Sequence, residues 1–173
     1  MLLNTGQTRK EWDDHIVGVG KIVQQLSSTL RVLGYTLGTG HSRPRDLLIM
    51  QALALLPDGA LVCVQRSVVL GTYSDRKGAV RAELVVGGFI VTPVAGAPNT
   101  CEVCFLHALD SLGTTKSDDN DRVNGRMVLS LISLKRHIAM LEKRWLKVVP
   151  RLPPVPFRLR AVCDTSTVTS ADP

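Results

Sequence analysis

The sequence of 173 residues predicts an α+β domain in which a curved antiparallel sheet of about six strands grips one long C-terminal helix. Two observations lead to this fold. Between residues 21 and 110, apolar runs rich in Val, Leu and Ile alternate with short turn-forming segments, which is typical of successive strands. An apolar stripe with spacings of three and four residues then indicates a single amphipathic helix. Such a helix can cover the apolar face of the sheet.

The chain is expected to begin with a short helix and a first pair of strands. Residues 8–11 read Thr-Arg-Lys-Glu, which is the pattern of a capping box, and Trp12 and Ile16 would share one face of the helix that it starts. Residues 21–26 and 30–37 are separated only by Ser and Thr. We therefore expect two strands joined by a tight turn.

The middle of the chain predicts four further strands. The turn-forming sequence Pro57-Asp58-Gly59 directly follows an almost wholly apolar run, so the runs on both sides of it are interpreted as a hairpin. The paired Gly87 and Gly88 indicate a bulge or bend within one long strand. The expected strands span residues 47–56, 60–70, 80–93 and 100–110.

A long helix over about residues 126–148 is expected next, followed by a disordered tail. Basic residues of this segment fall mainly opposite its apolar stripe. From Pro150 onward the chain is rich in proline and then in Ser and Thr, without periodicity. We therefore divide the chain into a domain over residues 1–148 and a disordered tail over 149–173. The stripe consists of Leu131, Leu134, Ile138, Leu141, Trp145 and Val148.

The composition limits the classes of protein to consider. Aromatic residues make up only 4%, so aliphatic side chains must build the interior. A sheet wrapped around one helix can then enclose an aliphatic cavity for an apolar ligand, unless Leu and Val fill the space. No apolar run approaches the roughly 20 residues of a transmembrane helix, and the polar N-terminus is unlike a secretory signal. We therefore expect a cytoplasmic protein.

The net charge of +6 is concentrated near the C-terminal end. Residues 122–160 hold ten Lys and Arg but a single acidic residue, Glu142. Such a segment can contact an anionic membrane surface or an acidic protein, or it can simply be a solvated helix face with a basic tail. We expect no nucleic-acid partner, because no aromatic stacking cluster accompanies the basic run.

No constellation of residues points to catalysis or metal binding. Cys101 and Cys104 form a C-x-x-C pair, but no second pair of ligands lies at zinc-site spacing, and a strand would turn the two thiols to opposite faces. A lone histidine such as His107 is more often a packing residue than a base. No Ser-His-Asp order and no glycine-rich phosphate loop is present. We therefore expect no enzyme activity, no metal and no cofactor.

Several short motifs together resemble the START family, the steroidogenic-acute-regulatory-protein-related lipid-transfer domains. The segment Arg9-Lys10-Glu11-Trp12-Asp13 is similar to the helix that this family places before its mid-sheet strands. The resemblance covers roughly residues 8–148 and rests on the order and spacing of the motifs. The others are Pro44-Arg45-Asp46, Arg66-Ser67-Val68, the run from Lys77 to Glu83, Gly88-Phe89-Ile90-Val91-Thr92-Pro93, and His107-Ala108-Leu109-Asp110 before Gly113.

The resemblance implies a helix-grip fold with a tunnel that holds one lipid of the sterol, phospholipid or ceramide class. Residues 126–148 would be the lid helix, and residues 71–78 would match a mobile loop at the mouth. Because the family domain has a helix and strands before the position of Trp12, the chain resembles a domain truncated at its N-terminus. We expect it to be part of a larger multidomain protein.

The predicted function is therefore lipid binding or lipid transfer. Gln51 and His107 are predicted as polar partners of the lipid. The competing hypothesis is a membrane-docking or protein-interaction module without lipid transfer, with the protein peripheral at anionic membranes. The remaining predicted lipid-binding residues are Phe105, Leu131, Leu134, Ile138 and Leu141.

Overall fold

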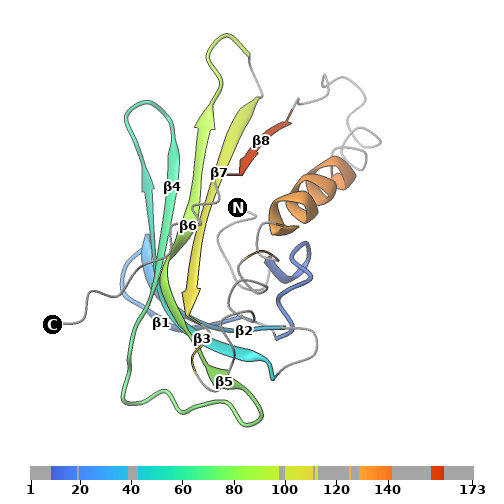
Figure 1. The fold of residues 1–173 in the computed structure, drawn as a ribbon. Helices are drawn as coiled ribbons and strands as arrows, with labels where there is room; N and C mark the ends of the chain where they lie inside the picture. Colours follow the sequence, from blue (N-terminus) through green and yellow to red (C-terminus); the bar gives the residue numbers. More distant parts are fainter. Residues whose placement is uncertain are drawn as a thin grey trace, which may run out of the picture.

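One curved sheet with a helix beside it makes up the structure, a computed structural model (Figure 1). It describes residues 9–18, 20–38, 43–97, 100–110, 112, 125 and 129–141, and the backbone of residues 157–161. Arg9 and Lys10 form a helical turn, and residues 129–141 form the C-terminal helix. The strands are β1 (Lys21–Gln25), β2 (Leu30–Leu37), β3 (Arg45–Leu55), β4 (Leu61–Ser67), β5 (Val80–Arg81), β6 (Glu83–Pro93), β7 (Cys101–Asp110) and β8 (Phe157–Ala161).

The connectivity of the sheet is that of a meander. Strands follow the spatial order β1-β2-β3-β4-β6-β7-β8, and β5 pairs with β3 beside this path. The pairs β3–β5 and β7–β8 are parallel, and the other pairs are antiparallel. The predicted class, a curved antiparallel sheet with one C-terminal helix, is confirmed. The predicted turn at residues 57–59 is confirmed as well: Gly59 has φ +83°, and the Asp58 carboxylate accepts the Ala60 N–H at 3.0 Å.

The predicted strand over residues 80–93 is divided in two by Ala82. Residues 80 and 81 pair with β3, whereas residues 83–93 pair with β4 and β7. The ladder to β7 shifts register between Leu84 and Val86, slightly before the glycine pair. Gly88 has another role: with φ +147°, a Cβ there would lie 1.9 Å from the Cys63 carbonyl oxygen on β4. A glycine therefore allows β4 and β6 to approach.

The two faces of the sheet have different partners. Side chains alternate along each strand, and those of the inner face form one buried cluster that includes Leu131 and Leu134 of the helix. Figure 1 shows the helix on this inner side of the sheet. The predicted continuation of the helix over residues 142–148, with Trp145 and Val148, lies outside the described residues. The sheet's part of the cluster includes Leu33, Tyr35, Leu37, Leu47, Ile49, Cys63, Leu84, Phe89, Val103, Phe105 and Leu109.

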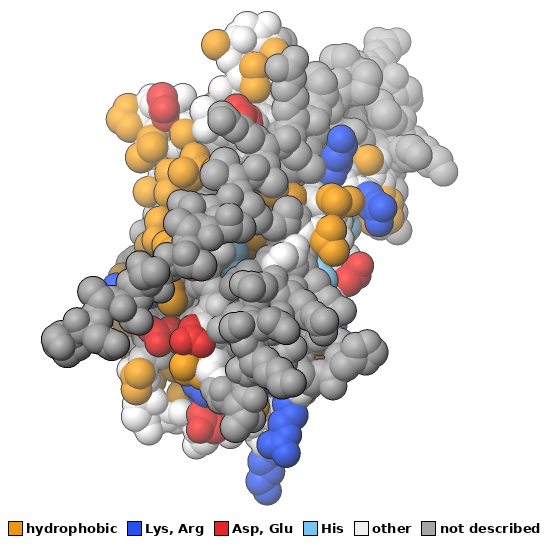
Figure 2. All heavy atoms as spheres, viewed as in Figure 1, with side chains coloured by type: hydrophobic (Ala, Val, Ile, Leu, Met, Phe, Trp, Pro, Cys, Tyr) orange, Lys and Arg blue, Asp and Glu red, His pale blue; other side chains and the backbone are white. Residues whose placement is uncertain are grey.

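The outer face carries exposed aliphatic side chains and one packed loop. Figure 2 shows hydrophobic side chains gathered along the side of the molecule where Figure 1 places β4. On this face Val64, Ile90 and Leu106 are 43–49% exposed. The connection over residues 68–79, part of which the resemblance placed at the mouth of a tunnel, lies against the outer face of β2. There Arg76 Nη1 donates a hydrogen bond to Thr36 Oγ1 at 2.7 Å.

The prediction of a disordered tail does not hold for residues 157–161. These residues form β8, which pairs in parallel with β7 from Cys101↔Phe157 to Phe105↔Ala161. The reason lies in the local sequence, since the last proline of the run is Pro156 and the following Phe-Arg-Leu-Arg-Ala alternates with a period of two. Residues 149–156 and 162–173 lie outside the described residues.

Candidate ligand-binding site

A buried ion pair lies at the centre of the interior between the sheet and the helix. Arg9 Nε contacts Asp13 Oδ2 at 2.8 Å, and the two side chains are only 6% and 0% exposed. The short turn places them together, because the Asp13 N–H bonds the Arg9 carbonyl at 2.8 Å. Residues four apart in a helical turn share one face. A buried guanidinium is thereby partly compensated inside an apolar core.

Three aromatic rings surround the Arg9 guanidinium. Its Cζ lies 5.8 Å from the ring centroids of Trp12 and Tyr35 and 5.6 Å from that of Phe89, which is the distance range of cation–π contacts. Burial by itself would lower the pKa of Arg9, but the Tyr35 oxygen and the Asp13 carboxylate outweigh it and raise that pKa. Burial raises the pKa of the Tyr35 phenol. At neutral pH the site therefore holds a guanidinium cation beside a neutral phenol.

One donor of this guanidinium remains available. Arg9 Nη2 is buried and has no hydrogen-bond partner among the described residues. Buried donors are normally satisfied, so an unsatisfied one requires an explanation, and a bound ligand is one that fits an interior site. The geometry thus provides a charged donor beside three aromatic rings.

The Asp13 carboxylate also connects the C-terminal helix to the N-terminal turn. Ser130 Oγ donates a hydrogen bond to Asp13 Oδ1 at 3.0 Å, and Ser130 is fully buried. Next to it, Leu131 and Leu134 are each 2% exposed. Further along the helix, Ile138 and Leu141 are only half-buried. The helix is therefore held firmly at its beginning and more loosely toward residue 141.

The predicted polar partner Gln51 belongs to a second buried polar contact. Its Oε1 accepts hydrogen bonds from Arg31 Nε at 2.9 Å and from Arg31 Nη2 at 2.5 Å across β2 and β3. Gln51 is 1% exposed, so its side chain is buried, and its oxygen already accepts hydrogen bonds from Arg31. Burial raises the pKa of the neighbouring Cys63 thiol, which stays protonated at neutral pH.

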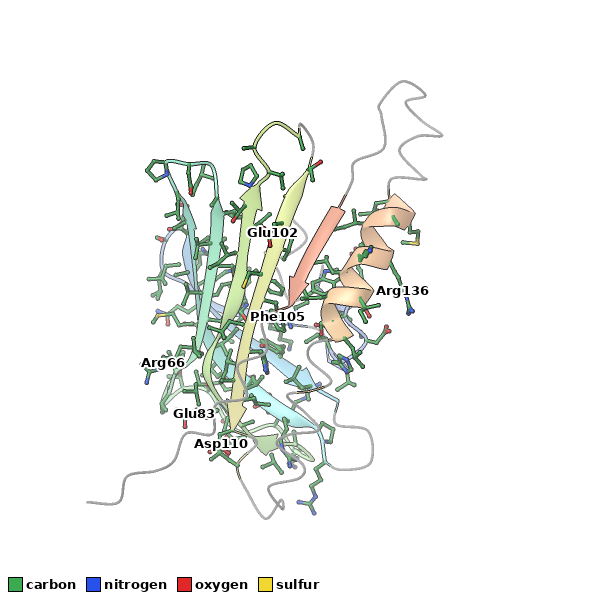
Figure 3. All side chains as sticks on the ribbon, turned by 45° about the horizontal axis from the view of Figure 1, so that its top comes forward. Arg66, Glu83, Glu102, Phe105, Asp110 and Arg136 are labelled. Atoms are coloured by element: carbon green, nitrogen blue, oxygen red, sulfur yellow. The ribbon has the colours of Figure 1, made fainter. Side chains whose placement is uncertain are left out.

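Phe105 and His107 lie on the same face of β7. The Phe105 ring stacks on Phe89 at 4.7 Å between centroids, and the His107 ring lies 5.7 Å from Phe105. Figure 3 shows Phe105 on the side of β7 that faces the helix, whereas Arg66 lies on the opposite side of the sheet. Of the seven predicted lipid-binding residues, Phe105, Leu131 and Leu134 belong to the buried cluster between sheet and helix, and Ile138 packs against it.

Sequence reasoning missed the residues at the centre of the site. Arg9 and Asp13 were noted only as part of a short helix, although their spacing of four residues was a signal for an ion pair. The partner Ser130 is 117 residues away from Asp13, and no local pattern connects the two. Tyr35 and Phe89 were likewise assigned to strands without any role at a site.

No group of His, Cys, Asp and Glu among the described residues is arranged to hold a metal ion. No helix in the described part of the chain combines the length and the apolar character needed to span a membrane.

A curved antiparallel sheet closed by a C-terminal helix over an apolar interior defines the helix-grip class of proteins. Residues 1–116 match the family model of the START domain, and the chain belongs to this family. Its sheet and C-terminal helix have the helix-grip fold of this family. No curated protein sequence matches the chain significantly.

Solved structures of three human proteins share the fold. The StAR-related lipid transfer protein 5 is 22% identical with a TM-score of 0.61, and the match covers 78% of this chain and 62% of that one. The lipid transfer and protein localization domain of StarD13 is 19% identical with a TM-score of 0.59, covering 73% and 63%. STARD10 is 18% identical with a TM-score of 0.63, covering 91% and 67%. The chain therefore spans less than two thirds of the first two structures.

Proposed function

We propose that this protein binds one lipid molecule between the inner face of the sheet and the helix over residues 129–141, with Arg9 as its polar anchor. The observation that carries the proposal is the buried Arg9 Nη2 donor without a partner. Aromatic and aliphatic side chains around it form a surface suited to a lipid body, with Phe105, Leu131 and Leu134 among them.

The energetics favour a ligand with an uncharged oxygen near its polar end. An unsatisfied buried donor costs about 1–3 kcal/mol, and a ligand acceptor offsets that cost. Asp13 already neutralises the Arg9 guanidinium. A hydroxyl or carbonyl oxygen of the ligand would therefore accept the remaining hydrogen bond without adding net charge to a low-dielectric interior. Each buried methylene contributes about 0.8 kcal/mol in addition. The family resemblance implies a sterol, phospholipid or ceramide, and of these three classes sterols and ceramides fit these features.

Lipid entry requires the helix to separate from the sheet. Leu131 and Leu134 are fully buried, and each contributes about 1.5–3 kcal/mol to the closed state. Separation is therefore easiest at the half-buried Ile138 and Leu141, with Ser130–Asp13 as the fixed end. The helix would act as a lid that opens from the end near residue 141.

Native mass spectrometry of the protein incubated with vesicles that contain sterol, ceramide and phospholipid tests the proposal. We expect one lipid per chain, and its mass identifies the class. The variant Arg9→Met should bind at least about tenfold more weakly, since a charged hydrogen bond contributes about 1.5–3 kcal/mol. Lys10→Met, at the exposed neighbouring position, is the matched control.

Loss of folding has to be separated from loss of binding. The double variant Arg9→Met with Asp13→Ala removes both charges, so it tests the anchor without leaving a buried unpaired carboxylate. A folded double variant that binds lipid as tightly as the wild type contradicts the anchor. A folded wild-type protein that takes up no lipid from any vesicle contradicts the proposed function.

The alternative function is docking to an anionic membrane without lipid uptake. Lys135 and Arg136 are exposed, and Figure 3 shows Arg136 on the side of the helix away from the sheet. Basic residues near an anionic surface contribute about 1 kcal/mol each and are screened by salt. Vesicle binding that disappears at high salt, without any bound lipid, would favour this alternative. In either case we propose a cytoplasmic protein that is peripheral at membranes.

A further inference from the structure

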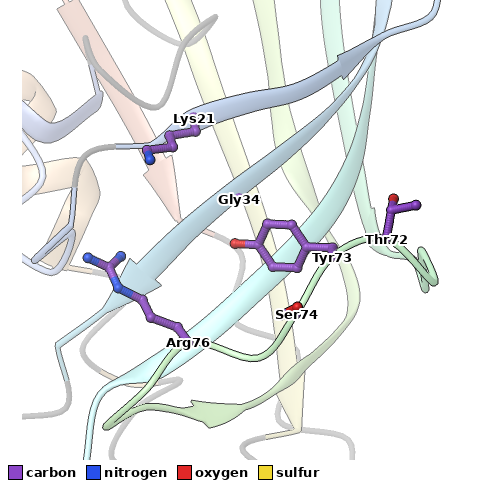
Figure 4. A pocket seen from close by; sticks show the side chains of 6 residues that line it. All are labelled: Lys21, Gly34, Thr72, Tyr73, Ser74 and Arg76. Atoms are coloured by element: carbon purple, nitrogen blue, oxygen red, sulfur yellow. The ribbon is translucent and has the colours of Figure 1, made fainter.

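A polar pocket lies on the outer face of the sheet, away from the proposed lipid site. Its floor is Gly34 on β2, whose neighbours Leu33 and Tyr35 point into the core, so position 34 faces outward. The volume of the pocket is about 450 Å³. Figure 4 shows the side chains around it: Lys21, Thr72, Tyr73, Ser74 and Arg76, with Gly34 behind them.

Two cations from different elements border this pocket. Lys21 is supplied by β1, where it pairs with Gly34 in the ladder, and Arg76 by the connection between β4 and β5. Arg76 Nη1 donates to Thr36 Oγ1 at 2.7 Å, which orients the guanidinium and leaves its other nitrogens for a ligand. Neither cation takes part in a salt bridge among the described residues.

The nearby carboxylates are already engaged by a third cation. Arg81 Nη2 contacts Asp46 at 3.1 Å and Asp75 at 2.8 Å. The Asp46 carboxylate also attracts Arg76 and accepts a hydrogen bond from its backbone, but neither Arg76 nor Lys21 forms a direct salt bridge with these two acids, so both side chains can still contact an anion.

Tyr73 is held in place by close packing and adds a hydroxyl. Its ring lies 5.0 Å from Arg81 Cζ. A Cβ on Gly34 would lie 2.6 Å from the Tyr73 hydroxyl oxygen, so the absence of a side chain at position 34 lets Tyr73 lie across β2. Burial, reinforced by Asp46, raises the pKa of the Tyr73 phenol, which remains a hydrogen-bond donor at neutral pH. In Figure 4 this hydroxyl, the Lys21 ammonium and the Arg76 guanidinium point toward the same part of the pocket.

We propose that this pocket binds the phosphate group of a phosphomonoester. Two cations and the Tyr73 hydroxyl match the charge and the several acceptor oxygens of a phosphate, which arginine and lysine bind by charge-assisted hydrogen bonds. A carboxylate has fewer acceptor oxygens and less charge than a phosphate, so it would bind these groups more weakly. The phosphate is carried either by a lipid headgroup or by a soluble ester. The site is separate from the interior and does not depend on the proposed lipid.

Binding of two probes to the full chain tests this proposal. Glycerol 3-phosphate is titrated by calorimetry, and vesicles with and without phosphatidylinositol 4-phosphate are tested by co-sedimentation. Tighter binding of the soluble ester identifies a soluble source, and binding only to the phosphoinositide vesicles identifies a headgroup. Either result supports the phosphate site. Absence of binding to both probes, or equal affinity for acetate, overturns it.

Matched variants assign the binding to the pocket. Lys21→Gln and Arg76→Gln should each weaken binding at least about tenfold, because each removes a charge-assisted contact. Lys77→Gln makes the same charge change at an exposed neighbouring position outside the pocket and should change the affinity less than about twofold. Equal losses for Lys77→Gln and Arg76→Gln would reduce the effect to net charge and refute the site. Thermal unfolding checks that each variant is folded.

Discussion

Replacing Asp13 by alanine should strongly destabilise the fold. Asp13 is fully buried, and it accepts hydrogen bonds from Arg9 at 2.8 Å, from Ser130 at 3.0 Å and from the His15 N–H at 3.2 Å. Removal of one partner of a buried ion pair costs about 3–5 kcal/mol, since the other charge is left uncompensated. The buried Ser130 hydroxyl also loses its acceptor, which costs about 1–3 kcal/mol more. A domain is stable by only about 5–15 kcal/mol in total, so the variant should be close to unfolded.

Urea unfolding followed by circular dichroism measures this effect. Asp14→Ala is the control, because Asp14 is the exposed neighbour and its removal should cost less than about 0.5 kcal/mol. The double variant Arg9→Met with Asp13→Ala removes the orphaned charge as well. It should recover at least about 2 kcal/mol relative to Asp13→Ala, because an apolar side chain then fills the guanidinium site among the aromatic rings.

Two results would refute this reasoning. One is an Asp13→Ala protein within about 1 kcal/mol of the wild type, which would mean that the pair is not desolvated as its burial indicates. The other is a double variant whose loss equals the sum of the two single losses, because charges in contact must show a coupling energy in a double-mutant cycle.

Three further predictions concern stability. Gly88→Ala should cost more than about 3 kcal/mol of stability or prevent folding, because its Cβ would lie 1.9 Å from a backbone oxygen of β4. The control Gly96→Ala, at φ +70° with open space around it, should cost only about 1 kcal/mol. Similar losses for the two variants would contradict the close approach of β4 and β6. Burial raises the pKa of Asp46 in spite of Arg81. Between the unfolded-state and folded-state pKa values, the folded protein therefore keeps a proton on Asp46 that the unfolded chain has lost. Stability consequently falls as the pH rises between these two pKa values. Asp46→Asn should remove a slope of up to about 1.4 kcal/mol per pH unit from urea unfolding measured between about pH 4 and pH 7, and an unchanged pH profile would disprove this contribution. Leu134→Ala should cost about 2–5 kcal/mol in the same assay and Ile132→Ala, at an exposed position of the same helix, less than about 0.5 kcal/mol; equal effects would mean that the helix does not cover the sheet.

The six predicted strands were recognisable because each carries its signal locally. Alternation places Leu33 and Tyr35 in the core and Gly34 outside, and the turn at Asp58-Gly59 has the residues that a tight turn needs. The division at Ala82 was not recognisable, because it depends on Ala82 N–H bonding the Asp46 carbonyl at 3.0 Å, a contact across 36 residues of chain. The pairing of β8 with β7 is equally remote in sequence.

The apolar helix residues of the candidate site were predictable from the sequence, whereas the charged donor Arg9 was not. Periodicity alone selects Leu131, Leu134 and Ile138 as the helix face that covers the sheet, because burying that face is the main way for an amphipathic helix to gain stability. The charged donor was not predictable in this way, because an arginine side chain is ordinarily exposed to solvent. Its burial requires Asp13 and three aromatic rings to converge from separate elements.

The order of residues already specified the types of the main elements, the inner and outer faces of the strands and the family of the chain, since these follow from spacing and local motifs. Long-range packing specified the rest: the burial of Arg9 beneath the helix, the Ser130–Asp13 contact and the placement of Arg76 beside Lys21. The physical reason is that desolvation of a charge depends on every atom around it. That environment exists only once distant segments have come together.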